Sequence, residues 1–282
     1  MFRSLLFVPG DSARKLEKAL TTQADALILD LEDSVAPSAK DSARASVAEA
    51  LRGVKTDKFM IVRINALSTP QPLLDLKAVV GLADAIMLPK CEGGRDAQRA
   101  GCYIEAFEVA AGREHKRTKL LPIVTETARS VLALTAELES SERLMGLVWG
   151  AEDLASDLGA FGNKDGGAYR SPYRLARDLC LFAAAGAGLM AIDTVYADIA
   201  DLDGLAREAA AAKRDGFAAK MAIHPSQVDV INQAFTPTQE ETDWAEAVAG
   251  AFAASPGAGA LRLDGRMIDQ PHLKLARRIL SR

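Results

Sequence analysis

Eight short apolar runs recur along this chain, and stretches of helical periodicity separate them. The runs are mostly continuous in Val, Ile and Leu rather than alternating with polar residues, as expected for strands that are covered on both faces. They are Leu5 to Pro9, Ala26 to Leu31, Met60 to Asn65, Ala85 to Pro89, Leu121 to Thr125, Gly146 to Gly150, Ala191 to Tyr196, and Ala219 to Ile223. Eight β/α alternations predict a closed parallel (β/α)8 TIM barrel.

The intervening stretches predict the helices of that barrel. They include Ser12 to Thr22, Lys40 to Leu51, Thr127 to Leu138, Ser171 to Ala185, and Leu202 to Arg214. A chain of 282 residues has room for one barrel and a smaller appendage. We therefore expect a TIM-barrel domain over residues 1–226 and a C-terminal helical extension over residues 227–282.

The extension lacks strand patterning. The stretch from Thr238 to Ala254 is predicted to be a helix, with Thr238 placed three residues before Glu241 as in a capping box. Ser255 to Gly259 breaks that helix, Asp264-Gly265 predicts a turn, and a last helix is expected near the C-terminus. We expect the extension to pack on a neighbouring subunit or over the mouth of the barrel.

The charge and the cysteines exclude several classes of protein. A formal net charge of -4 and a pI near 5.6 give no overall attraction for nucleic acid, so small-molecule partners are expected. Cys91, Cys102 and Cys180 have no metal or disulfide spacing and are predicted to be packing residues in a reducing compartment. The longest apolar run, Ala183 to Ile192, is too short to span a bilayer, and no targeting segment is recognised. A cytoplasmic protein without a membrane partner is expected.

Two of the apolar runs end in carboxylates. Glu126 follows the fifth run, and Glu152 and Asp153 follow the sixth. Because the C-terminal ends of parallel strands meet at one end of a barrel, Glu126 and Asp153 are candidate ligands of one Mg²⁺, which prefers carboxylate oxygens and water. The alternative is that each acid caps the helix behind it, which is the better interpretation for Glu152.

Arg63 interrupts the third apolar run with a guanidinium group. Its planar fork matches a substrate carboxylate beside the metal, whereas a structural ion pair with Asp30, Glu32 or Asp33 is the alternative, and the two roles are compatible. So many acids cannot all ligate one ion. Glu32 and Asp33 are therefore interpreted as partners that orient Arg63, Lys90 or water.

Other signals for chemistry are weaker. A glycine turn before Arg14 leads into a helix and is a weak candidate for phosphate binding. The chain has no G-x-S-x-G, H-E-x-x-H or P-loop motif, which disfavours a serine hydrolase, a zinc protease and a P-loop NTPase.

A set of motifs, in order along the chain, carries a family resemblance. The set comprises Arg3-Ser4-Leu5-Leu6-Phe7-Val8-Pro9-Gly10, Leu29-Asp30-Leu31-Glu32-Asp33-Ser34-Val35, Val62-Arg63-Ile64-Asn65, Met87-Leu88-Pro89-Lys90, the Glu126 run, Gly150-Ala151-Glu152-Asp153-Leu154 and Ala222-Ile223-His224-Pro225. It resembles the citrate lyase β-subunit-like branch of the HpcH/HpaI aldolase superfamily, of the malyl-CoA and citramalyl-CoA lyase type. The match runs through all eight predicted strands and into the extension.

The resemblance implies an enzyme: a Mg²⁺-dependent TIM barrel, assembled as a homotrimer or hexamer, that reversibly cleaves a carbon-carbon bond. Its substrates would be 3-hydroxyacyl thioesters such as malyl-CoA, citramalyl-CoA or citryl-CoA, giving an acyl thioester and a keto acid: glyoxylate, pyruvate or oxaloacetate. Residue by residue, the resemblance makes Glu126 and Asp153 the metal ligands and Arg63 the group that binds the substrate carboxylate. Arg14 becomes a weaker candidate for contacting the thioester phosphate.

The resemblance also singles out the segment from Gly265 to His272. Its aspartate, Asp269, corresponds to an acid/base residue that enters the active site of the neighbouring subunit. Capping of the last helix is the alternative role for this side chain.

Two other classes stay open. The chain can be the β subunit of a multi-subunit citrate lyase acting on an acyl-carrier thioester, or an enzyme with malate-synthase-like or thioesterase activity on the same intermediates. It can also be a barrel that binds without turnover, although an intact set of Arg63, Glu126, Asp153 and Asp269 speaks against that.

Overall fold

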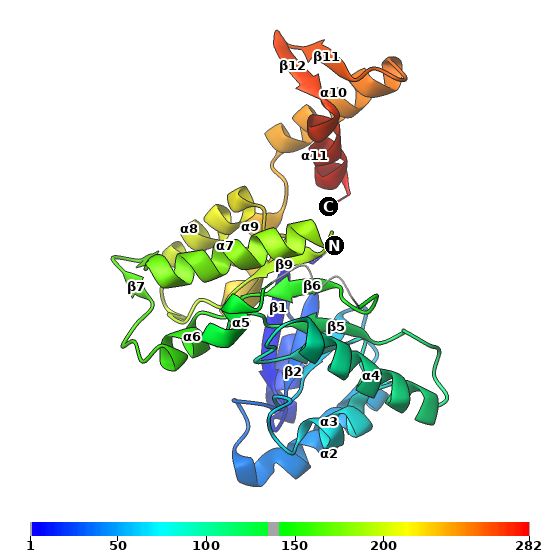
Figure 1. The fold of residues 1–282 in the computed structure, drawn as a ribbon, viewed down its shortest axis with the longest axis vertical. Helices are drawn as coiled ribbons and strands as arrows, with labels where there is room; N and C mark the ends of the chain where they lie inside the picture. The colour runs from blue at the N-terminus through cyan, green and yellow to red at the C-terminus, as the bar shows by residue number, and fades with distance from the viewer. Residues whose placement is uncertain (1, 135–140, 282) are drawn as a thin grey trace. The chain divides into compact units, whose positions relative to one another are not determined.

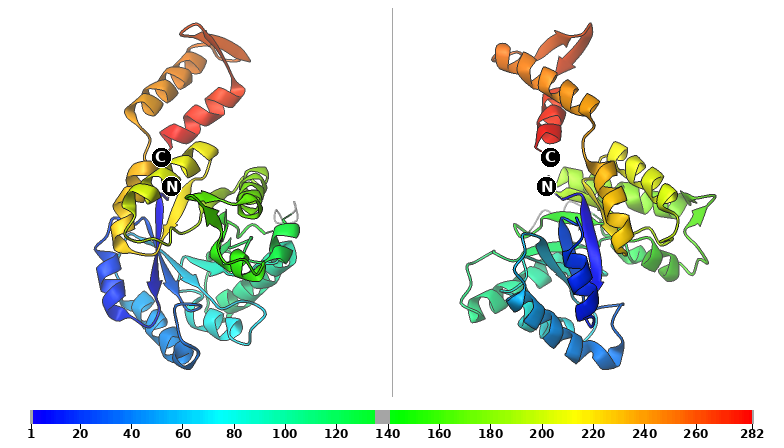
Figure 2. Two further views of the ribbon diagram at one scale, coloured as in Figure 1. Left: turned by 90° about the vertical axis from the view of Figure 1, so that its left-hand side faces the viewer. Right: turned by 180° about the vertical axis from the view of Figure 1, so that it is seen from behind.

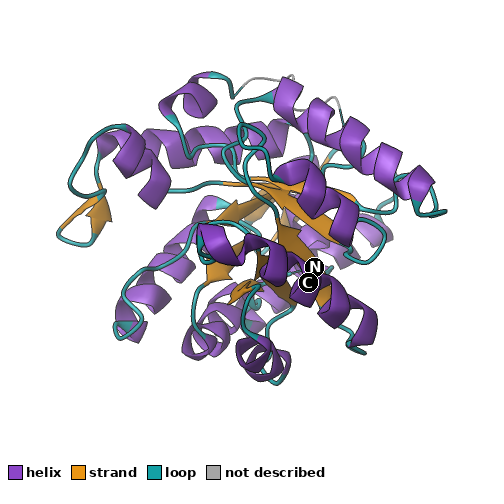
Figure 3. Cartoon of the chain, turned by 90° about the horizontal axis from the view of Figure 1, so that it is seen from below, coloured by secondary structure: helices purple, strands orange, loops and turns teal. Residues whose placement is uncertain are grey.

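The computed structural model describes residues 2–134 and 141–281. Within them, eight parallel strands form one sheet in the order β5-β4-β3-β2-β1-β10-β9-β6, and helices surround it (Figures 1 and 3). The strands are β1 (Ser4–Pro9), β2 (Ala26–Asp30), β3 (Phe59–Arg63), β4 (Ala85–Leu88), β5 (Lys119–Pro122), β6 (Gly146–Val148), β9 (Met190–Asp193) and β10 (Ala219–Ala222). The predicted TIM barrel is confirmed.

The sheet closes between its two edge strands, β5 and β6. Parallel bridges join Leu120 to Leu144 and Ile123 to Val148. The backbone N–H of Val124 donates to the carbonyl of Val148 over 2.8 Å, which extends the pairing beyond the end of β5. Closure leaves no free edge to pair with another chain, so the polar backbone groups of these strands are satisfied within the barrel.

Some of the helices around the barrel begin at side-chain caps, such as Ser12, which accepts from the N–H of Lys15, and Thr127, which forms a capping box with Ser130. They are α1 (Ala13–Leu20), α2 (Lys40–Gly53), α3 (Pro72–Val79), α4 (Gly94–Ala110), α5 (Ala128–Leu132), α6 (Glu152–Asp157), α7 (Ser171–Gly186), α8 (Leu202–Asp215) and α9 (Val228–Phe235), with 3-10 turns at Pro37–Ala39 and Pro225–Gln227. The predicted helix over Thr127 to Leu138 is realised as α5, and the part from residue 135 to 138 lies outside the described residues.

The barrel interior is filled by alternate residues of the strands. The inward cluster consists of Leu5, Ala26, Ile28, Ile61, Ala85, Met87, Leu121, Ile123, Val148, Ile192, Ala219 and Met221. Successive side chains of a strand point to opposite faces, so the inward series Ala26, Ile28 continues with Asp30, and Ile61 continues with Arg63. The two charged residues are register partners on β2 and β3 and therefore enter the barrel side by side at its C-terminal end.

Most strands end earlier than the apolar runs do. The fifth run was predicted to extend to Thr125, but β5 ends at Pro122, and β6 ends at Val148 rather than Gly150. The difference has a simple cause, because the runs of apolar residues continue into buried loops where only isolated pairing contacts remain. Glu126 and Asp153 consequently lie on the loop and helix beyond the strands, at the mouth of the barrel.

The chain divides into two compact units, Phe2–Ala234 and Phe235–Arg282. The predicted boundary after residue 226 lies within the first of these units, just before α9. That helix belongs with the barrel because Asn232 accepts from the Ser4 hydroxyl of β1 over 2.7 Å and donates to the carbonyl of Gln23 over 2.7 Å.

The second unit contains strands that the sequence analysis did not predict. Beside α10 (Gln239–Ala254) and α11 (Gln270–Leu280), an antiparallel hairpin is formed by β11 (Ala260–Leu263) and β12 (Arg266–Asp269) (Figure 2). The extension is thus not purely helical, and that part of the prediction was wrong. The turn at Asp264-Gly265, with φ of 46° and 79°, is the one predicted, and it is the tight left-handed turn that joins two strands.

A second hairpin, β7 (Lys164–Asp165) and β8 (Ala168–Tyr169), lies between α6 and α7.

Cys91 and Cys180 are buried as predicted for packing residues, whereas Cys102 is exposed on α4, so the prediction was wrong for that residue. None of the helices in the described part of the chain is long and apolar enough to cross a membrane.

Candidate active site

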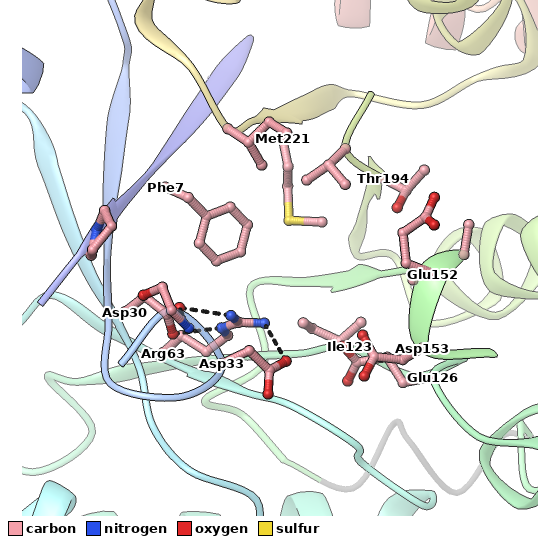
Figure 4. Close-up of a pocket in the computed structure, with 16 residues that line it drawn as sticks. Phe7, Asp30, Asp33, Arg63, Ile123, Glu126, Glu152, Asp153, Thr194 and Met221 are labelled. Carbon is pink, nitrogen blue, oxygen red and sulfur yellow. Dashed lines mark hydrogen bonds and ion pairs between the residues drawn. The ribbon is translucent and has the colours of Figure 1, made fainter. Parts of the chain in front are cut away.

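A cavity of about 390 Å³ opens at the C-terminal end of the barrel strands (Figure 4). Its size is typical of a small-molecule site. The residues that line it are Phe7, Pro9, Asp30, Asp33, Ser34, Arg63, Ile123, Glu126, Gly150, Ala151, Glu152, Asp153, Thr194, Val195, Met221 and Ile223. The structure therefore brings together three of the predicted site residues: Arg63, Glu126 and Asp153.

Arg63 and Asp30 form a buried bidentate pair. The Nε and Nη2 groups of Arg63 donate to the two carboxylate oxygens of Asp30, each over 2.7 Å. Burial opposes ionisation of Asp30, yet its hydrogen bonds and charge interaction with Arg63 outweigh this and lower its pKa. The predicted alternative, a structural ion pair, thus forms. It occupies one edge of the guanidinium and leaves the Nη1 end toward the cavity.

The Nη1 end of Arg63 is shared among other acids. It lies 3.1 Å from Glu32 Oε2 and 3.8 Å from Asp33 Oδ2, and the guanidinium stacks 4.9 Å above the ring of Phe7. Glu32 also accepts from the Lys90 ammonium over 2.6 Å. Glu32 and Asp33 thus contact Arg63 and Lys90, while their orienting role stays a prediction.

Glu126 is held by the backbone of Lys90. Lys90 has φ of 50°, in the left-handed region, and its N–H donates to Glu126 Oε2 over 2.5 Å. Gly150 provides the room for this carboxylate, since a Cβ atom at position 150 would lie 2.7 Å from Glu126 Cγ. Non-glycine residues rarely adopt positive φ, and they do so most often where a site requires it.

Asp153 lies on the first turn of α6, across from Glu126, and is about one-third exposed. Its Oδ1 is 3.3 Å from Lys90 Nζ. The neighbouring Glu152 is the first residue of the same helix, where its charge interacts favourably with the helix dipole. It accepts from Asn163 Nδ2 over 2.8 Å and also lines the cavity. Lys90 is therefore the one described residue that contacts Glu126, Asp153 and Glu32 together.

The donor set fits a hard divalent cation. Burial, followed by the charges of Asp153 and Glu32, raises the pKa of Glu126 to about 8. Such a buried group of like charges is stabilised by a metal ion, and carboxylates are what Mg²⁺ prefers. Glu32 Oε2 is also buried without a well-aligned hydrogen bond in the described residues. The described residues include no group of three or more His, Cys, Asp or Glu side chains placed to hold one metal ion, so Glu126 and Asp153 would need water or substrate to complete the shell.

Binding of Mg²⁺ should depend on pH through Glu126. Below a pKa of about 8 the carboxyl holds a proton that the metal must displace, so affinity should rise with pH and level off above about 8, with close to one proton released per ion near neutral pH. Calorimetric titration in two buffers of different ionisation enthalpy measures that proton. The same titration above the pKa serves as the control, since release should vanish there. An affinity that is flat between about pH 6 and 8 would contradict the assignment.

Two predicted site residues do not line this cavity. Asp269 lies in the second unit as the N-cap of α11, where its N–H and Oδ1 are 3.2 and 2.6 Å from His272 Nδ1. The alternative capping role is thus realised, while the catalytic role stays a prediction. Arg14 is exposed on α1, and its phosphate role also stays a prediction.

Sequence reasoning missed the apolar side of the cavity. Thr194 and Val195 follow β9, and Met221 is on β10. The alternation of Ala219 and Met221 about Lys220 was the available signal, but it does not tell which of the two buried faces lines a cavity.

Comparison with known proteins decides the family. The model of the HpcH/HpaI aldolase/citrate lyase family matches residues 3–225, which cover the barrel. The chain belongs to the HpcH/HpaI aldolase/citrate lyase family. As a member of this family it is an enzyme of the lyase type.

Relatives in this family agree with the expected cofactor. The chain is 40% identical to the citrate lyase subunit beta of Escherichia coli, over 99% of this chain and 92% of that protein. It is 36% identical to the mitochondrial citramalyl-CoA lyase of Rattus norvegicus, over 99% of this chain and 85% of that protein. A solved structure of the protein CitE from Mycobacterium tuberculosis, in complex with magnesium, acetoacetate and coenzyme A, is 34% identical, with a TM-score of 0.79 and coverage of 99% and 96%. The prediction of Mg²⁺ agrees with the magnesium in that relative.

Proposed function

We propose that this enzyme is a Mg²⁺-dependent carbon-carbon lyase that reversibly cleaves a 3-hydroxyacyl-CoA into an acyl-CoA and an α-keto acid. The observation that supports this most is the presence, in one cavity, of the Arg63 guanidinium and two carboxyl groups, Glu126 and Asp153, that share Lys90 as their cation. The carboxylate of an α-keto acid can bind the Arg63 guanidinium. One carboxylate oxygen and the keto oxygen can together bind a metal ion held by Glu126 and Asp153. The coenzyme A complex of the Mycobacterium tuberculosis relative supports the thioester.

Each residue of the site has a part in this reaction. The Nη1 end of Arg63 binds the carboxylate of the keto-acid half, and Asp30 fixes the plane of the guanidinium. The backbone of Lys90 keeps Glu126 oriented, and its ammonium holds Asp153 and Glu32. When bound by Glu126 and Asp153, Mg²⁺ would supply Lewis-acid polarisation of the oxygen on the carbon whose bond breaks.

Cleavage requires proton movement at two atoms. The 3-hydroxyl loses its proton as the C2–C3 bond breaks, and the electron pair of that bond passes to the thioester as an enolate. The enolate then takes a proton at its α-carbon, which gives the acyl thioester. We assign both transfers to the carboxyl group of Asp269 of an adjacent subunit, within a homotrimer or hexamer: it takes the hydroxyl proton and delivers it to the α-carbon.

A substrate panel tests the proposed function. Malyl-CoA, citramalyl-CoA and citryl-CoA should be cleaved in the presence of Mg²⁺, with release of a keto acid and an acyl-CoA, and chelation should stop the reaction. Release of free coenzyme A without a keto acid would instead identify a thioesterase. Absence of any turnover on all three would refute the proposal.

The similarity to citrate lyase subunit beta favours a second candidate. In that case the thioester is carried by an acyl-carrier protein rather than coenzyme A. Genes for a carrier protein and a CoA-transferase-like subunit next to this one would favour the multi-subunit enzyme, and activity of the isolated chain on CoA thioesters would count against it.

Arg63→Lys should weaken keto-acid binding. A lysine keeps the charge but cannot serve Asp30 and a substrate carboxylate at once, so the KM for the keto acid in the condensing direction should rise about tenfold or more. Arg44→Lys is the control, because Arg44 also donates through two of its nitrogens to carboxylates, one bond each to Asp75 and Asp41, and does not line the cavity. If Arg63→Lys leaves the KM for the keto acid unchanged and loses as much stability as Arg44→Lys does, Arg63 has only a structural role.

A further inference from the structure

The two sides of the cavity differ in their chemistry. Charged groups occupy one side, where Arg63 and Asp30 face Glu126 and Asp153. Across from them Phe7, Val195 and Met221 form an apolar surface, bordered by Thr194 and Glu152, and Figure 4 shows the Met221 side chain pointing into the space between Phe7 and Thr194. Met221 is only 3% exposed and packs within the apolar cluster of the barrel interior, with Phe7 and Val195 against it.

Acids outnumber bases around this space. Six carboxylates line it or contact its cations, namely those of Asp30, Glu32, Asp33, Glu126, Glu152 and Asp153. Arg63 is the single cation among the described lining residues, and Lys90 is the only other one in contact with these acids. Arg63 is already bound to Asp30, and Lys90 to Glu32. One substrate carboxylate finds a donor in Arg63, but a second would meet repelling acids or an apolar wall.

We propose that the enzyme selects a keto acid with a small apolar substituent, of which pyruvate is the simplest, and that Met221 together with Val195 makes this selection. The inference rests on the proposed function and names its substrate class, a 3-hydroxyacyl thioester with a methyl group on the hydroxyl-bearing carbon. Oxaloacetate is disfavoured because its second carboxylate would lose water at the apolar wall without gaining a partner. Glyoxylate is disfavoured because it leaves the wall uncontacted.

The position of Met221 is fixed by the sheet. It pairs in register with Leu5 of β1, and its inward orientation follows from the alternation that also turns Ala219 inward. An unbranched thioether adapts to the shape of a small apolar group. Val195 follows β9 and contributes a branched surface to the same wall.

Condensation with acetyl-CoA and Mg²⁺ measures the selection. The wild-type kcat/KM should be at least about tenfold higher for pyruvate than for glyoxylate or fresh oxaloacetate. Met221→Ser should reduce both ratios several-fold, whereas Met221→Leu, which keeps the wall apolar, should preserve them. Val195→Thr, which is nearly isosteric, should also lower the ratio of kcat/KM for pyruvate to that for oxaloacetate. This variant provides the test if Met221→Ser does not fold.

The outcomes distinguish a failure of the keto-acid selection from a failure of the lyase function. Equal use of the three keto acids, or a preference for oxaloacetate, would overturn the selection and leave the lyase function standing. Unchanged ratios in Met221→Ser and Val195→Thr would show that these residues do not select. If none of the three keto acids condenses and none binds in the presence of Mg²⁺, the proposed function fails and the selection fails with it.

Discussion

Asp153→Ala should abolish lyase activity while the barrel stays folded. The side chain is one-third exposed at the start of α6 and is not part of the barrel core, so its removal costs little stability. It is also one of the two carboxylates that we propose as Mg²⁺ ligands, and a single remaining carboxylate should hold the ion much more weakly. We expect turnover to fall by several orders of magnitude and calorimetry to detect no Mg²⁺ binding at millimolar concentrations.

The control for Asp153→Ala is Asp165→Ala. Asp165 is exposed on the β7–β8 hairpin and does not line the cavity, so this variant should keep both activity and metal binding. Thermal unfolding should confirm that both variants fold. Full activity of Asp153→Ala in the presence of a chelator would show that the reaction does not use this site.

Asp269→Asn should reduce turnover by about 10²- to 10⁴-fold without loss of stability. Asn can still cap α11 but cannot give or take the proton at the thioester α-carbon. Asp264→Asn is the matched control in the same unit. Asn tolerates the positive φ of Asp264 in the hairpin turn, so this variant should behave as the wild type.

Subunit exchange tests where Asp269 acts. Mixing inactive Asp269→Asn chains with inactive Asp153→Ala chains should restore part of the activity, because some interfaces then combine an intact metal site with an intact aspartate. Normal turnover of Asp269→Asn would leave this residue only its capping role. Mixed chains that exchange but stay inactive would refute the shared site.

Local patterns predicted the barrel because its strands are buried on both faces. The apolar runs that became β2 and β3 needed no knowledge of their partners. Their ends were less predictable, since apolar residues continue into buried loops, as between Pro122 and Glu126. The hairpin of β11 and β12 was missed because its strands are half-exposed and short. The Asp264-Gly265 turn between them is a strong hairpin signal, and it was interpreted only as a turn.

The site was predictable where charge stands out from an apolar background. Arg63, Glu126 and Asp153 were each recognisable for that reason, and the structure places them around one cavity. The sequence could not show that Asp30 takes two donors of Arg63, because this depends on the register of β2 against β3. It could not show the apolar wall either, since Met221 looks like any other core residue until the strands are assembled.

The left-handed backbone of Lys90 sets steric strain against charge at one position. A glycine there would adopt φ of 50° without steric cost, but it would also remove the ammonium that neutralises the buried Glu32 and joins it to Asp153. The relief of the backbone and the loss of the ion pairs oppose each other in the stability of the fold. A variant with Gly at position 90 should therefore gain little in heat resistance while it loses activity.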